Sequence, residues 1–191
     1  MSARPIATTR TAAGMPTGKL AVWWVIVSEI VIFGGLLASY IMHRLAHDAF
    51  SQAAAHTNMW IGAFNTLVLL SSSLTAVLAH AAAQEGNGPK AARLIWCTIG
   101  GAFTFLTVKT FEWTEEITHG FTITSSTFWS FYYTAAGLHA LHVLAGAIIM
   151  MFVAASAAKN LELHRVELIG LYWHFVDVVW IFLFPLLYIA K

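Results

Sequence analysis

The residues of this sequence that could do chemistry are a few ionisable side chains set within long apolar stretches. They are Glu29, the pair Lys109 and Glu112, the pair His139 and His142, and the pair His174 and Asp177. An ionisable group at membrane depth costs roughly 3 kcal/mol or more unless it finds a partner, so each one is a functional hypothesis. Glu29 stands alone, and desolvation favours a neutral or hydrogen-bonded carboxyl there. We expect Glu29 to tie two helices together, to take part in proton transfer or to face lipid.

His139 and His142 are three residues apart and therefore project from one face of a helix. Two such histidines could ligate a haem if a facing helix supplied another at similar depth. His174 is the main candidate for that role, besides His80 near a helix end. The single cysteine and the lack of a second histidine-rich helix argue against a metal or haem site. We expect packed, hydrogen-bonded core histidines and no cofactor in this chain.

The last apolar stretch carries a polar stripe. Glu167, Gly170, His174 and Asp177 fall within an arc of about 80° on a helix. His174 and Asp177 are three residues apart, which predicts an ion pair or a neutral hydrogen-bonded pair inside a bundle. The predicted buried polar packing layer comprises Asn65, His139, His142, Glu167, His174 and Asp177.

Lys109 and Glu112 lie near the outer end of their apolar stretch, where a lysine can snorkel to the membrane surface. We interpret them as an interfacial pair. Small residues at helical spacing mark close helix packing, as membrane interfaces require. These seams comprise Gly62, Asn65, Ser72, Ala76 and Ala79 in one stretch, and Gly34 with Ala38 and Gly35 with Ser39 in another.

Membrane-spanning helices must position these side chains. Of the 191 residues, 59% are apolar and only 10% charged, which is too few to cover a soluble protein of this size. The net charge of +1 excludes a nucleic-acid binder. Apolar stretches long enough to cross about 30 Å occupy residues 20–42, 58–83, 94–113, 127–155 and 168–190. Because lipid offers the backbone no hydrogen bonds, we expect an all-α integral membrane bundle of five transmembrane helices.

Lysines and arginines in the flanking loops predict the orientation. Seven lie on the side of the N-terminus and two on the other, which puts the N-terminus in the cytoplasm, or the matrix if the protein is organellar, and the C-terminus outside. We expect a cytoplasmic arm over residues 1–19 and one transmembrane domain over residues 20–191. No phosphate-binding motif, zinc-type H-E-x-x-H or paired nucleophile and base is present, so the chain itself carries no predicted catalytic centre.

Several of the stretches that hold these polar residues resemble a known family. Residues 171–185, with the run Y-W-H-F-V-D-V-V-W, are similar to the last helix of subunit III of haem-copper oxidases. Residues 131–146 resemble the G-x-H-x-x-H-V helix of that family. Residues 28–33, 65–73 and 111–113 resemble further elements of it, in the same order along the chain. The sequence is therefore identified as a five-helix form of the cytochrome c or quinol oxidase subunit III family.

The resemblance implies a non-catalytic subunit of a respiratory terminal oxidase, which reduces O₂ and pumps protons. Its partners would be subunit I, which would hold the haems and copper, and subunit II, together with membrane phospholipid. Glu29 matches the buried, carbodiimide-reactive carboxyl of the family, which implies a place near the proton route. The implied location is a bacterial plasma (inner) membrane, as a multi-pass protein.

The longer members of the family have seven helices, and the five stretches here match the last five of them. The resemblance therefore implies that a complete lipid cleft needs another subunit to supply the first two helices. The resemblance leaves the electron donor open between cytochrome c and quinol. An accessory subunit of nitric oxide reductase and, from the histidines alone, a b-type haem anchor are the alternatives.

Overall fold

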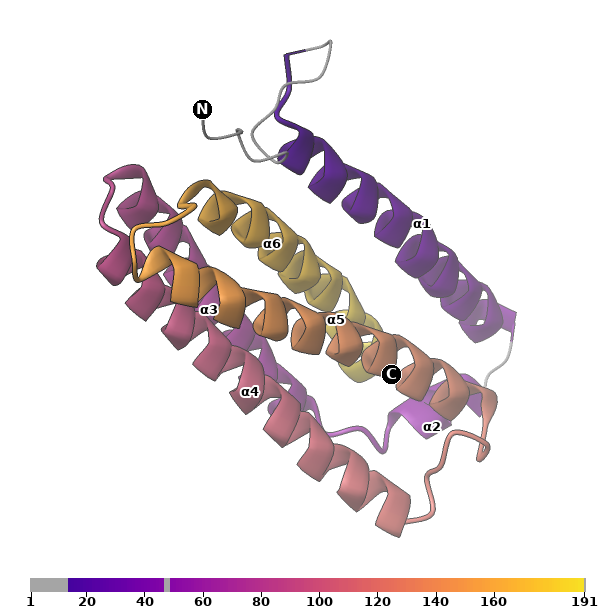
Figure 1. Ribbon diagram of the computed structural model, residues 1–191. Helices are drawn as coiled ribbons and strands as arrows, with labels where there is room; N and C mark the ends of the chain where they lie inside the picture. The colour runs from indigo at the N-terminus through magenta and orange to yellow at the C-terminus, as the bar shows by residue number, and fades with distance from the viewer. Residues whose placement is uncertain (1–13, 47–48, 191) are drawn as a thin grey trace.

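The structure, a computed structural model, describes residues 14–46 and 49–190. It is built from five helices long and apolar enough to cross a membrane, which confirms the predicted all-α membrane bundle. They are α1 (Thr17–Ala46), α3 (Met59–Gln84), α4 (Gly88–Thr118), α5 (Thr127–Ala157) and α6 (His164–Phe184), as Figure 1 shows. A short helix, α2 (Ala49–Ala54), follows α1, and a π-helical turn, η2 (Pro185–Ile189), continues α6.

The helices start and end at recognisable signals. Asn58 caps α3 by accepting a hydrogen bond of 3.0 Å from the Trp60 amide, and Asn87 caps α4 in the same manner. Helix α4 runs beyond the predicted stretch 94–113 at both ends, which places Glu115 and Glu116 on the helix. Most of the predicted arm, residues 1–19, lies outside the described residues, and the chain is helical from Thr17 onward. Which side of the membrane each end faces stays a prediction.

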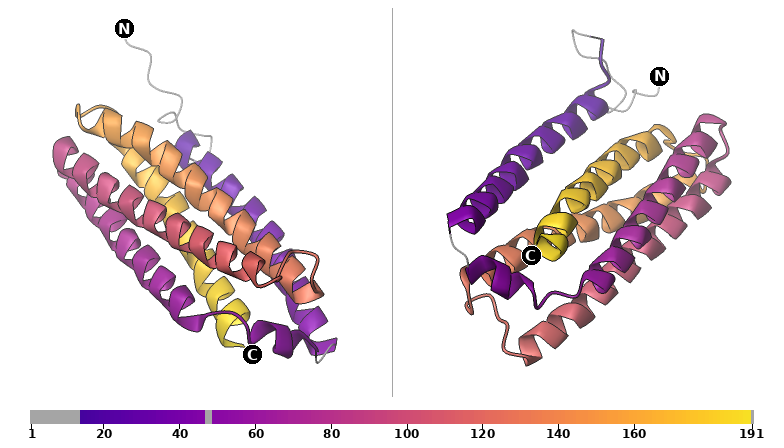
Figure 2. Two further views of the ribbon diagram at one scale, coloured as in Figure 1. Left: turned by 90° about the horizontal axis from the view of Figure 1, so that it is seen from below. Right: turned by 180° about the vertical axis from the view of Figure 1, so that it is seen from behind.

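Helices α3, α4, α5 and α6 pack closely, whereas α1 lies to one side against α5 and α6 (Figures 1 and 2). Close packing of α3 on α4 depends on Gly101, where a Cβ atom would come within 2.7 Å of the Ser72 Cβ. The seam predicted on α3 from Gly62 to Ala79 is buried, as expected for a packing face.

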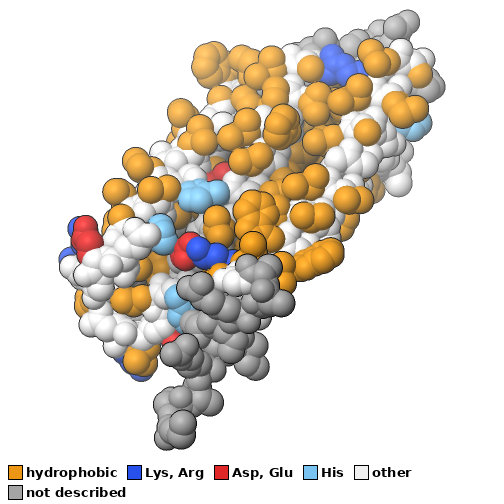
Figure 3. All heavy atoms as spheres, turned by 90° about the horizontal axis from the view of Figure 1, so that it is seen from above, with side chains coloured by type: hydrophobic (Ala, Val, Ile, Leu, Met, Phe, Trp, Pro, Cys, Tyr) orange, Lys and Arg blue, Asp and Glu red, His pale blue; other side chains and the backbone are white. Residues whose placement is uncertain are grey.

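Helix α1 exposes most of its surface. Its buried side chains Ile26, Phe33 and Tyr40 recur every seven residues, so they form one narrow stripe. The small residues Gly34 and Gly35 are exposed, and a Cβ atom at either would meet nothing within 4 Å. The seam predicted there therefore does not pack against the described part of this chain. Figure 3 shows hydrophobic side chains spread over much of one face of the molecule.

Candidate functional site

Glu29 of α1 and His142 of α5 form a pair between the two helices. Glu29 Oε2 lies 3.2 Å from His142 Nε2, and the side chains are 14% and 17% exposed. The other ring nitrogen, Nδ1, lies 2.8 Å from the Leu138 carbonyl oxygen. Because a carbonyl can only accept, Nδ1 carries a proton and donates it. The contact is an ion pair when the imidazole is also protonated at Nε2, and Glu29 Oε2 makes no hydrogen bond with the described residues.

Two further contacts orient His142. The Phe33 ring packs edge-on against the imidazole with 5.5 Å between ring centres, and Tyr172 of α6 donates a 3.3 Å hydrogen bond to the His142 carbonyl. The sequence left three roles open for Glu29, which were joining two helices, proton transfer and facing lipid, and it named no partner. The partner is a histidine more than one hundred residues away in the chain.

His139 lies one turn from His142 but has a different environment. It is fully buried, between the rings of Phe105 at 5.4 Å and Trp180 at 5.1 Å. Neither ring nitrogen has a hydrogen-bond partner among the described residues. His139 is therefore packed as predicted but lacks the predicted hydrogen bond. No group of three or more His, Cys, Asp or Glu side chains that could hold a metal ion occurs in the part of the chain that the structure describes.

The predicted pair of His174 and Asp177 is not formed. His174 Nδ1 lies 2.7 Å from the Ser73 hydroxyl of α3, because α3 presents that group at the level of the imidazole. Asp177 is only 4% exposed, and neither of its carboxyl oxygens has a hydrogen-bond partner among residues 14–46 and 49–190. The i, i+3 spacing thus put both side chains on the α6 stripe but identified the wrong partner for His174.

The other two members of the predicted polar layer differ from each other. Asn65 is fully buried, and neither amide atom has a hydrogen-bond partner in the described residues. Glu167 is part-exposed and forms an ion pair of 2.5 Å with Lys19 at the start of α1. Glu167 therefore joins two helix ends rather than belonging to a buried layer, which corrects the prediction for it.

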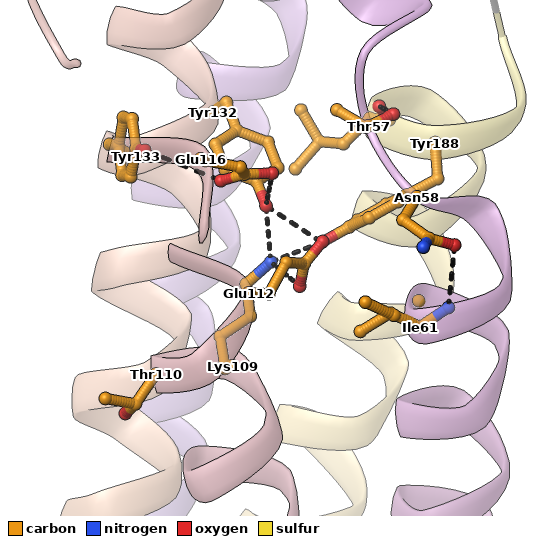
Figure 4. Close-up of polar contacts among 12 residues, drawn as sticks. Thr57, Asn58, Ile61, Lys109, Thr110, Glu112, Glu116, Tyr132, Tyr133 and Tyr188 are labelled. Atoms are coloured by element: carbon orange, nitrogen blue, oxygen red, sulfur yellow. Dashed lines mark hydrogen bonds and ion pairs between the residues drawn. The ribbon is translucent and has the colours of Figure 1, made fainter. Parts of the chain in front are cut away.

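Lys109 and Glu112 form the predicted ion pair, with 2.9 Å between Nζ and Oε2, but inside the bundle. The two side chains are 1% and 3% exposed, so the interpretation of a lysine that snorkels to the membrane surface is wrong. The physical reason is that two buried hydroxyls offer Lys109 a better position. Nζ donates to the Tyr132 hydroxyl at 2.8 Å and to the Tyr188 hydroxyl (Figure 4).

Glu116 completes this arrangement, which we call the lysine cluster: Lys109, Glu112, Glu116, Tyr132 and Tyr188. The Tyr132 hydroxyl accepts from Lys109 and donates to Glu116 Oε1 at 2.9 Å. Lys109 Nζ also lies 4.6 Å from the centre of the Tyr132 ring and 5.0 Å from that of Tyr188, which adds cation–π attraction. The cluster joins α4, α5 and η2.

Sequence reasoning missed Glu116, Tyr132 and Tyr188. A signal existed for Glu116, which stands four residues after Glu112 and seven after Lys109 and so continues the same helix face. No comparable signal existed for the tyrosines, because they come from two other elements.

Comparison with known proteins decides the family. The sequence matches the family model described as cytochrome c oxidase subunit III over residues 5–191. The chain belongs to the cytochrome c oxidase subunit III family. It is 34% identical over 170 residues to cytochrome c oxidase subunit 3 of Corynebacterium diphtheriae, covering 85% of this chain and 83% of the relative. With cytochrome c oxidase subunit 3 of Thermostichus vulcanus it shares 31% identity over 169 residues, covering 86% and 83%.

A third relative has a different chain organisation. The haem-copper oxidase subunit I+III of Aeropyrum pernix is 29% identical over 183 residues, which are 90% of this chain and 22% of the relative. The five spans and the bacterial subunit III relatives together make this chain a multi-pass bacterial membrane protein with the subunit III role in a haem-copper oxidase.

Proposed function

We propose that this subunit III is non-catalytic and packs against subunit I, which holds the haems and the copper. The family match over nearly the whole chain carries this proposal. The Aeropyrum pernix relative is named as subunits I and III in one polypeptide, which supports direct contact between the two. The exposed face of α1, with Gly34 and Gly35 open to a neighbour, supplies small residues of the kind that membrane helix interfaces need. Subunit II would be a further partner.

We also propose that the pair Glu29 and His142 supports proton uptake into subunit I. Glu29 Oε2 lies 3.2 Å from His142 Nε2, and both side chains are partly exposed between α1 and α5. A carboxyl and an imidazole this close could take up and release a proton in turn, since the imidazole beside it lowers the cost of the charged carboxylate. Their position between α1 and α5 supports a role beyond helix packing.

We propose that phospholipid binds between α1 and the bundle. A groove of about 490 Å³ lies there, and Val25, Ile149, Phe152 and Leu168 are among its apolar lining residues. Arg165 also lines the groove and is half exposed; its Nη2 pairs with Glu162 at 2.9 Å, and its remaining N–H donors suit a headgroup phosphate above an acyl chain.

Purification of the tagged chain from its native membrane tests the proposed function. We expect co-purification of a large subunit with haem absorbance, and no Soret band from the isolated chain. A colourless complex, or haem retained by the chain alone, would contradict the proposal. Turnover with reduced cytochrome c and with a quinol would then identify the electron donor.

A further inference from the structure

A second polar site lies beside the lysine cluster, where α3 begins and α4 ends. It is a hollow of about 250 Å³, and its polar lining residues are His56, Asn58, Glu112, Glu115, Glu116 and His119. Figure 4 shows Asn58, the N-cap residue of α3, and Ile61 of α3 across from Glu112 of α4. The role of subunit III assigns nothing to this hollow, and we call it the acidic hollow.

Three carboxyl groups line the acidic hollow, and one ammonium lies beside them. Lys109 is the ammonium within the cluster, and it contacts Glu112 directly. Glu116 is buried beside it and is held by tyrosine hydroxyls, which carry no charge. Glu115 adds a third carboxyl at the exposed side. Buried carboxylates need a cation or a proton close by, and a positively charged ligand in the hollow would supply a cation.

One carboxylate oxygen in this hollow lacks any partner. Glu112 is 3% exposed, Lys109 holds its Oε2, and its Oε1 has no hydrogen bond among the described residues. His119 provides a second acceptor, because its Nδ1 lies 2.8 Å from the Glu115 carbonyl oxygen and must donate to it. That leaves Nε2 of a neutral His119 as an acceptor. The carbonyl end of α4, with its negative partial charge, also ends here.

The acceptors are spread around the hollow rather than gathered at one point. No group of three or more His, Cys, Asp or Glu side chains that could hold a metal ion occurs among the described residues. A primary ammonium has three N–H donors and a positive charge. A quaternary ammonium has none and would leave Glu112 Oε1 without a hydrogen bond.

The surroundings of the hollow place it at the membrane boundary. Trp60, Phe111 and Ile117, near these ends of α3 and α4, are 77%, 71% and 52% exposed. A second hollow shares His56 and Asn58 with the first and is lined by Trp60 and Met59, which extends the site toward apolar surface. Ammonium can reach this position as a lipid headgroup or as a soluble amine.

We propose that the acidic hollow binds a primary ammonium group, such as the ethanolamine headgroup of a phospholipid, through Glu112 Oε1, Glu115 and His119. The test uses the full chain with the subunits that purify with it, delipidated and titrated with short-chain phosphatidylethanolamine or phosphatidylcholine. Bound lipid is counted by native mass spectrometry. We expect the ethanolamine lipid to bind about tenfold or more tightly than the choline lipid, as one charge-assisted hydrogen bond would give.

The variants use the exposed carboxyl so that folding is preserved. Glu115→Gln should weaken ethanolamine lipid binding about tenfold, whereas Glu85→Gln, an exposed glutamate at the other end of α3, should leave it unchanged. Free ethanolamine that competes as well as the lipid would support the site with a soluble amine as its ligand. Equal binding of the two lipids, or equal loss in the two variants, would overturn the proposal. Neither result would affect the subunit III assignment, which co-purification tests separately.

Discussion

Replacing Lys109 by Met removes the cation of the lysine cluster and keeps the volume of its stem. The ammonium uses its three donors on Glu112 Oε2 and on the hydroxyls of Tyr132 and Tyr188. Without it, Glu112 Oε2 loses its Lys109 partner, and Oε1 already has no hydrogen bond among the described residues, so the buried carboxyl is left unpaired. Breaking a buried ion pair by removing one partner costs about 3–5 kcal/mol. Neutral hydrogen bonds between membrane helices average only about 0.6 kcal/mol, so the charge decides the size of the effect.

The assay is reversible unfolding of the purified chain in mixed micelles with increasing SDS, followed by circular dichroism. We expect Lys109→Met to lose about 3–5 kcal/mol, and Lys109→Met with Glu112→Leu to recover most of that loss, because the uncompensated charge is gone. Lys90→Met is the matched control. Lys90 and Glu85 are exposed and 3.8 Å apart, so we expect a change below about 1 kcal/mol. If Lys109→Met were as mild as the control, or the double variant no better than the single one, the cluster would not hold a buried charge pair.

Three further predictions follow from the contacts described above. Glu29→Gln keeps the shape of the side chain but removes its ionisable carboxyl. We therefore expect normal subunit assembly with slower proton uptake in stopped-flow measurements. Unchanged uptake would show that Glu29 has only a packing role. Ser73→Ala should lose about 1 kcal/mol of unfolding free energy with the His174 hydrogen bond. Asp177→Asn should change it by less than about 0.5 kcal/mol, because the carboxyl oxygens have no hydrogen-bond partner among the described residues. A larger loss for Asp177→Asn than for Ser73→Ala would contradict this assignment of partners. Gly101→Ala should lower the free energy of unfolding by about 1–3 kcal/mol, because its Cβ would lie 2.7 Å from a side-chain carbon of α3. Gly100→Ala, where nothing lies within 4 Å of the added Cβ, should be tolerated. Equal thermal stability of the two variants would contradict the close packing of α3 on α4.

The five helices could be predicted because membrane thickness sets the length of an apolar stretch and lipid forces each stretch to be helical. Helix ends were harder to predict. A hydropathy pattern marks only the apolar part of a helix, whereas backbone hydrogen bonds continue α4 to Thr118. For that reason Glu115 and Glu116 were not predicted to be helical. The separation of α1 from the bundle could not be predicted, since an apolar helix looks alike whether it faces lipid or protein.

For the polar sites, spacing identified residues on one helix but not their partners on another. It placed His174 and Asp177 on one stripe, whereas the imidazole bonds to Ser73, 101 residues away in the chain. The lysine cluster shows the same limit, because Tyr188 reaches Lys109 only through the π-helical turn after Pro185. Partners across helices depend on register and rotation, and a single sequence carries little information on either.

Helix α1 is joined to the rest of the chain largely by polar contacts. They lie at its start, middle and end, and they are the pairs Lys19–Glu167, Glu29–His142, Tyr40 with the Leu186 carbonyl and Arg44 with the Ala190 carbonyl. Because lipid removes the hydrophobic drive for helix association, these contacts and the packing of Phe33 and Tyr40 together hold α1 against the bundle. The middle contact involves Glu29, so the Glu29→Gln variant tests the attachment of α1 as well as any proton route. The two effects separate only if docking of α1 is measured alongside uptake.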